Sequence, residues 1–99
     1  MALQVYTVTL AGTTTPVQLS ATRQPFHSMR IESDASNAIA YFGKAGVTTS
    51  VYAGTVLANT ATITNAVTIG PFSGEYNSDI QEWWFLGTDG QKLRITLIT

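Results

Sequence analysis

The chain has 99 residues, which suits one domain, since domains cluster at about 100–150 residues and a second hydrophobic core would need more chain. Only 11% of the residues are charged and the formal net charge is −1, so no electrostatic field is available to hold a nucleic acid or an anionic membrane surface. The sequence has no cysteine, which excludes disulfides, thiolate zinc sites and cysteine nucleophiles. We therefore expect a single domain over residues 1–99, without a nucleic-acid or membrane partner.

Targeting signals are also not expected. No apolar stretch approaches the roughly 20 residues that span a bilayer, and residues 1–4 lack the basic start and apolar middle of a secretory signal. A small domain without disulfides gains extra stability from a well-packed core, a bound ion or a partner subunit. The composition therefore favours assembly with other subunits.

The first half of the chain is typical of β-structure, because its many threonines alternate with Val, Ile, Leu, Tyr and Phe. Residues 3–10 predict a first strand, within an N-terminal segment, residues 1–10, that serves as an edge strand or arm. Pro16 confines the second run, residues 15–20, to a sheet edge or to the start of a strand. The third predicted strand, residues 26–32, places His27 on the same face as Met29 and Ile31.

Five further segments precede the C-terminal part. In chain order these are a turn over 33–37, a strand over 38–42, a weaker strand over 47–52, an Ala/Thr-rich stretch over 53–65 with a short strand at 62–64, and a strand over 67–69. A loop over 70–79 follows. Residues 79–86 and 92–98 then predict a hairpin around the turn 87–90.

Seven to nine short strands, separated by turn signals about every 8–12 residues, predict an all-β fold. No stretch has the 3.6-residue apolar period of an amphipathic helix. We therefore predict a small antiparallel β-sandwich, jelly-roll-like in architecture.

Catalytic and metal-binding patterns are weak. His27 is the sole histidine, which excludes a catalytic triad or a multi-histidine metal site within one chain, and we expect it at the core edge or at an interface. Glu75 and Asp79 flank one loop and could hold Ca²⁺, but without a dense acidic run a solvated loop is favoured. No serine lies in a G-x-S-x-G context. We expect a protein that is not an enzyme and binds no metal or cofactor.

The aromatic pair Trp83–Trp84 is the most informative local feature, because neighbouring residues of a strand point to opposite faces. The set containing Ile80, Trp84 and Leu86 is the more apolar and is expected to face the core. Trp83 and Phe85 then lie on the outer face, covered either by a loop of the same chain or by a partner. Exposed aromatic patches mark interfaces or sugar-stacking platforms, and we favour a protein partner over a sugar.

Three more aromatic residues complete the predicted interface. Phe72 and Tyr76 lie in the loop 70–79 and are too large to be left in water, so we expect them to pack back or to serve as buried anchors. Tyr6 lies on the N-terminal strand, which could add to the sheet of a neighbouring subunit. The predicted interface residues are Trp83, Phe85, Phe72, Tyr76 and Tyr6.

Short segments along nearly the whole chain also carry a family resemblance. They are TTTPVQLSAT at 13–22, SMRI at 28–31, SN at 36–37, AYFG at 40–43, VTIGP at 67–71 and the C-terminal pair of strands, residues 79–98. Their order resembles small structural proteins of tailed bacteriophages, in which a G-T-P-V-Q-L-S-A-T start precedes a V-Y-V-G strand, a V-T-I-x-P segment and a final D-I-Y hairpin. Residues 81–84 and 53–65 depart from that pattern. The resemblance implies a β-sandwich virion component, in some members a capsid decoration or cement protein, and it brings no catalytic residues.

The expected function is that of a non-enzymatic virion protein that stabilises the phage head. Its partners would be the major capsid protein or another virion protein, together with copies of itself in a trimer or dimer. It would be made in the cytoplasm of the bacterial host and reside in the virion, on the capsid surface. Two alternatives stay open: a tail, baseplate or head-fibre component, and a carbohydrate-binding module in which Trp83 or Trp84 stacks on sugar rings.

Overall fold

The computed structural model describes residues 3–33, 39–57, 65–70 and 78–99, and the structural statements below refer to these residues. They form ten strands and one turn of 3-10 helix. The elements are β1 (Leu3–Thr9), β2 (Val17–Gln18), β3 (Pro25–Phe26), β4 (Ser28–Ser33), β5 (Ala40–Gly43), β6 (Gly54–Val56), β7 (Ala66–Ile69), β8 (Ser78–Asp79), η1 (Ile80–Glu82), β9 (Trp84–Leu86) and β10 (Lys92–Ile98).

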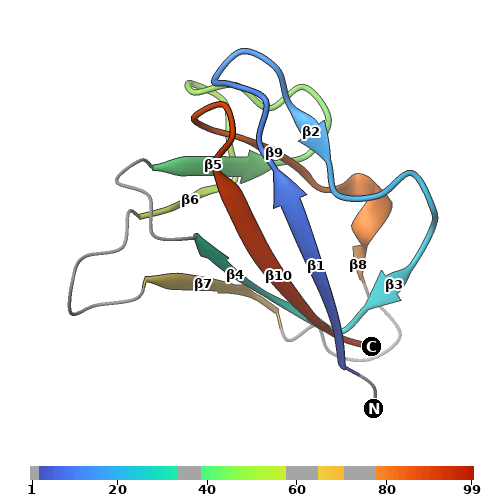
Figure 1. Ribbon diagram of the computed structural model, residues 1–99. Helices are drawn as coiled ribbons and strands as arrows, with labels where there is room; N and C mark the ends of the chain where they lie inside the picture. Colours follow the sequence, from blue (N-terminus) through green and yellow to red (C-terminus); the bar gives the residue numbers. More distant parts are fainter. Residues whose placement is uncertain (1–2, 34–38, 58–64, 71–77) are drawn as a thin grey trace.

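Two four-stranded antiparallel sheets pack face to face as a sandwich (Figure 1). Sheet A has the order β1-β10-β4-β7, sheet B has the order β2-β9-β5-β6, and β3 and β8 form a separate pair. The prediction of an all-β antiparallel sandwich is confirmed. The described strands number ten rather than seven to nine, because the chain is divided into strands as short as two residues.

The strands pair in a nested series, the outermost with the outermost. β1 pairs with β10, β2 with β9, β3 with β8, β4 with β7 and β5 with β6. Rolling this long double ribbon brings β10 beside β4 and β9 beside β5. The result is the topology of a jelly roll, in which Leu3 lies opposite Ile98 and the two ends of the chain meet at one end of the sandwich (Figure 1).

The predicted C-terminal hairpin is wrong, because β9 and β10 belong to different sheets. The turn between them is attached to the end of β1 instead: the Leu10 N–H donates to the Gln91 carbonyl at 2.7 Å, and the Gly90 N–H donates to the Leu10 carbonyl at 2.8 Å. Gly90 has φ +85°, a conformation that favours glycine. A glycine-rich turn thus reverses the chain without pairing the strands that it joins.

The inner faces of the two sheets form one hydrophobic core. Sheet A contributes the fully buried side chains Met29, Ile31, Leu93, Ile95 and Leu97. Sheet B contributes Ala40, Phe42, Val56 and Phe85. The buried Gln91 satisfies its amide by donating to the Ser33 hydroxyl at 2.9 Å and accepting from the Thr88 N–H at 3.2 Å.

The predicted third strand is divided at His27. The residues before it pair with β8, whereas those after it enter sheet A, and the His27 N–H donates to the Ile98 carbonyl at 2.6 Å at this change of sheet. Met29 and Ile31 are buried as expected, but the His27 side chain is exposed. The prediction that the three share a face, with His27 at the core edge, is therefore wrong for His27.

The predicted strand over 47–52 is a loop, and the strand that pairs with β5 is β6. Gly54 opposes Phe42 in this pair, and a Cβ on Gly54 would lie 2.5 Å from the Phe42 ring. Only glycine leaves room for that ring, so a residue that weakens most strands is required in this one. The residues predicted as a turn after Ser33, as a strand at 62–64 and as most of the loop before β8 lie outside the described part of the chain.

Candidate functional site: the outer face of sheet B

The helical turn η1 decides which tryptophan faces outward. Asp79 caps it, because a carboxylate oxygen of Asp79 accepts the Gln81 N–H at 3.0 Å. The turn interrupts the extended chain between Asp79 and Trp84, so the side-chain alternation starts anew after it. Residues on the two sides of η1 therefore cannot be assigned to one face by counting along the sequence.

Trp83 and Phe85 are core residues, which overturns their predicted place on the outer face. Trp83 is 6% exposed and Phe85 is 0% exposed. The indole N–H of Trp83 donates to the buried Ser78 hydroxyl at 2.9 Å, and both rings pack against Phe42. Neither side chain is accessible as an anchor for a partner.

The half-buried Trp84 lies on the outer face instead. It pairs across strands with Gln18 and Gly43, and cross-strand partners share a face. The same register places Leu86 on the outer face, opposite Tyr41, although Leu86 is fully buried. Leu86 is not part of the main core, so sheet B buries apolar side chains on both of its faces.

The loop 44–53 supplies a cover on this outer side. Val47 is buried but stands outside the main core, and a Cβ on Gly43 would lie 3.2 Å from a Val47 methyl group. The loop is held by its own backbone: the Ala53 N–H donates to the Phe42 carbonyl at 2.8 Å, and the Val47 N–H donates to the Lys44 carbonyl at 3.1 Å. These contacts keep a short loop in a fixed conformation on the sheet.

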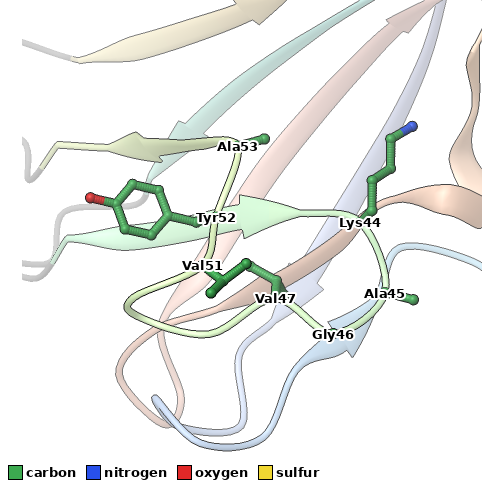
Figure 2. Close-up of a pocket in the computed structure, with 7 residues that line it drawn as sticks. All are labelled: Lys44, Ala45, Gly46, Val47, Val51, Tyr52 and Ala53. Atoms are coloured by element: carbon green, nitrogen blue, oxygen red, sulfur yellow. The ribbon is translucent and has the colours of Figure 1, made fainter.

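A shallow, largely apolar hollow of about 250 Å³ opens in this loop, lined by Lys44, Ala45, Gly46, Val47, Val51, Tyr52 and Ala53. Figure 2 shows the Lys44 and Tyr52 side chains pointing in different directions at opposite ends of the loop, with the two valines between them in the view. Val51 is 66% exposed and Tyr52 is 47% exposed. The Tyr52 ring lies 5.1 Å from the Tyr41 ring, centroid to centroid, with the ring planes tilted by 58°.

Lys44 adds a charge that is already balanced. Its ammonium nitrogen lies 2.7 Å from a carboxylate oxygen of Glu82 and 4.3 Å from the centre of the Trp83 ring. We call the group Tyr41, Lys44, Val51, Tyr52 and Trp84 the sheet B surface. It combines aromatic and aliphatic side chains with one neutralised ion pair.

Sequence reasoning missed most of this surface. Tyr41 could have been found, because it precedes a core phenylalanine in a strand and must therefore face the opposite way. Val51 and Tyr52 were hidden by their assignment to a strand. Of the other predicted interface residues, Tyr6 is half-buried against the core, with its hydroxyl donating to the Gln4 side chain at 3.1 Å. Phe72 and Tyr76 lie outside the described residues.

Asp79 is committed to structure. Its carboxylate accepts N–H groups from Gln24 and Gln81 and pairs with Arg23 at 3.2 Å. Burial raises its pKa, but the two backbone N–H groups and the Arg23 charge outweigh burial and hold the pKa below its usual value. Its predicted partner in a Ca²⁺ site, Glu75, lies outside the described residues.

Two searches of the described residues returned nothing. No group of three or more His, Asp or Glu side chains lies close enough to hold a metal ion in this part of the chain. None of the described helices has the length and apolar character to cross a bilayer.

Comparisons with protein families, with curated proteins and with solved structures found no match to this chain.

Proposed function

We propose that the protein is a non-enzymatic structural component of a tailed-phage virion, a decoration or cement subunit on the capsid. The observation that carries the proposal is the sheet B surface, where Val51, Tyr52 and a half-buried Trp84 are presented next to a neutralised lysine. Aromatic and aliphatic side chains with little charge are typical of the buried centre of protein interfaces. The partner would be the major capsid protein or another virion protein.

The fold and the sequence support the same proposal. Jelly rolls are found among viral capsid domains and lectins, although a fold by itself does not choose a function. The phage-like segments AYFG and VTIGP fall on β5 and on β7 with the residues after it, so they form part of the rolled ribbon. The loop 44–53, which carries the exposed Val51 and Tyr52, lies between them.

The mechanism would be adhesion. One such surface makes a weak contact, but a decoration subunit occurs in many copies, and each copy bridges shell subunits that are already held close together. Binding to the assembled shell and not to its separated subunits stabilises the shell by mass action, and linked contacts gain through effective concentration.

Co-sedimentation with phage heads that lack decoration tests the proposal. The protein is expected to bind heads saturably, at a fixed ratio to the shell protein, and to raise the temperature at which they release DNA. The double variant Val51→Ser/Tyr52→Ala should lose binding while keeping its unfolding midpoint, since both side chains are exposed. Leu57→Ser removes an exposed apolar side chain elsewhere and should bind normally. A protein that binds tails and ignores heads would move the proposal to the tail or baseplate.

The tyrosine pair favours a second candidate, a carbohydrate-binding module. Tyr41 and Tyr52 stand at ring-contact distance and Trp84 is partly accessible on the same sheet, whereas the buried Trp83 cannot stack on a sugar. Saturable binding to a neutral glycan on an array, lost in Trp84→Ala or Tyr52→Ala and unaffected in Leu57→Ser, would replace the capsid role if heads are not bound.

A further inference from the structure

The two sheets have four edges, and one differs from the rest. β2 has two residues and follows Pro16, while β6 and β7 have three and four residues and contact each other. β1 has seven residues, LQVYTVT, with no charge and no proline. Native proteins shorten, charge or cover sheet edges to prevent pairing with other chains. β1 shows none of these protections.

The main-chain groups available on that edge follow from the hydrogen bond of Leu10. The Leu10 N–H points to β10, because it donates to the Gln91 carbonyl at 2.7 Å. In an antiparallel ladder, residues alternate between bonding to the partner and facing away from it. The N–H and C=O groups of Leu3, Val5, Thr7 and Thr9 therefore face the open side.

The side chains of these four residues are also presented to solvent on the outer face of sheet A. Leu3 is 68% exposed and Val5 is 63% exposed. Ile98 and Thr96 of β10 stand beside them in the register. An apolar end of the strand is thus combined with a row of unpaired backbone groups.

We propose that β1 pairs antiparallel with β1 of a second copy of this chain, around a two-fold axis at Tyr6. In this register Leu3 lies opposite Thr9 of the other copy and Val5 lies opposite Thr7, so every outward-facing residue meets an outward-facing residue. The two four-stranded sheets become one continuous eight-stranded sheet. Its two ends are then the short strand β7 of each copy, and no long edge remains.

Charge distribution favours a second copy in this orientation. Arg94 and Lys92 stand beside Thr7 and Thr9, at the opposite end of β1 from Leu3. Antiparallel pairing places these cations at diagonally opposite corners of the joint sheet, next to the apolar end of the other copy. A parallel arrangement would bring them to the same end. A two-fold interface also closes on itself, because the same patch is used by both subunits.

Solution mass by light scattering, measured over a range of micromolar concentrations, tests the dimer in the absence of any phage component. The expected mass is twice that of one chain. Val5→Pro removes an N–H that faces the open side and leaves the ladder to β10 intact, and Val5→Lys places a charge on the edge; both should halve the mass. Thr68→Lys puts the same charge on the outer face of the other edge strand, β7, and should remain a dimer.

Hydrogen exchange of the unmutated protein gives a second reading that does not depend on variants folding. The amides of Val5, Thr7 and Thr9 should exchange more slowly as concentration rises. A monomer at every concentration, a mass of three chains, fast exchange of these amides at all concentrations, or a folded Val5→Pro variant that stays dimeric would overturn the proposal. A dimer that ignores phage heads would refute the capsid role and leave the dimer standing.

Discussion

The outer faces of the two sheets are built in opposite ways. On sheet A, threonines and charged residues alternate with core residues along strands of up to seven residues, as in the exposed Lys92 and Arg94 of β10. On sheet B the described strands have two to four residues, and Leu86 on its outer face is buried. A long strand separates inside from outside by alternation alone. A sheet of short strands needs a loop to cover it, and that loop carries the candidate site.

The largest expected effect is at the inner face of sheet B. Phe85→Ala removes a fully buried ring from the core and is expected to lower the free energy of unfolding by about 3–5 kcal/mol, measured by denaturant titration. Thr68→Ala, an exposed position on sheet A, should change it by less than about 0.5 kcal/mol. Equal effects at the two positions would contradict the assignment of Phe85 to the core.

Leu86→Ala tests the cover on the other face of the same strand. We expect a loss of about 2–3 kcal/mol, the lower part of the range for buried leucine, because a loop can close part of the cavity. Hydrogen exchange should also accelerate at the amides of Val47 and Ala53, which hold the loop through backbone bonds. If exchange at these amides does not change, the loop does not depend on Leu86.

Asp79→Asn probes the connection beside the two sheets, where β3 meets β8. Loss of the charged acceptor for Gln24, Gln81 and Arg23 is expected to cost about 1–3 kcal/mol at neutral pH. The pKa of Asp79 is lowered in the folded protein relative to 3.8, so its contribution is complete above that pH and is lost as the pH falls from 3.8 towards the lowered pKa. The difference in thermal midpoint between wild type and variant should therefore shrink below pH 3.8; a constant difference would contradict this reading.

The smallest effect is expected at the edge of the sheet B surface. Lys44→Met keeps the side-chain length but removes the ammonium group from Glu82 and from the Trp83 ring. Because both charged groups are about half exposed, the loss should be about 0.5–1 kcal/mol and should decrease at high salt. Tryptophan fluorescence should shift in parallel, and a salt-independent loss would indicate packing rather than charge.

The contrast between the sheets also explains what the sequence could predict. The alternation of Leu93, Ile95 and Leu97 predicts β10, and the structure has it within one residue of the expected bounds. In sheet B the inserted turn η1 resets the alternation, so Trp83 and Trp84 exchange their predicted places. β6 was missed because Gly54 is required by the Phe42 ring opposite it, a tertiary contact with no local signal.

Pairing partners were less predictable than the strands. The turn before β10 has the composition of a hairpin turn, yet it leads from one sheet to the other, because Leu10 rather than β9 binds it. The candidate site inherits this difficulty: Tyr41 and Tyr52 meet only after β5, the loop and β6 have folded together. A linear pattern contains the strands but not their neighbours.

The nested pairing of strands sets the order in which the chain can fold. Loop-closure entropy is smallest for β5 with β6 and increases outward to β1 with β10, which join the two ends of the described chain. During synthesis β1 emerges first of the ten strands and its partner emerges last. A ribosome-bound chain therefore carries an uncharged strand with both edges open until translation has passed β10. Folding is expected to be slow, as for other β-rich topologies of high contact order, and protection of nascent β1 by a chaperone becomes part of making this protein.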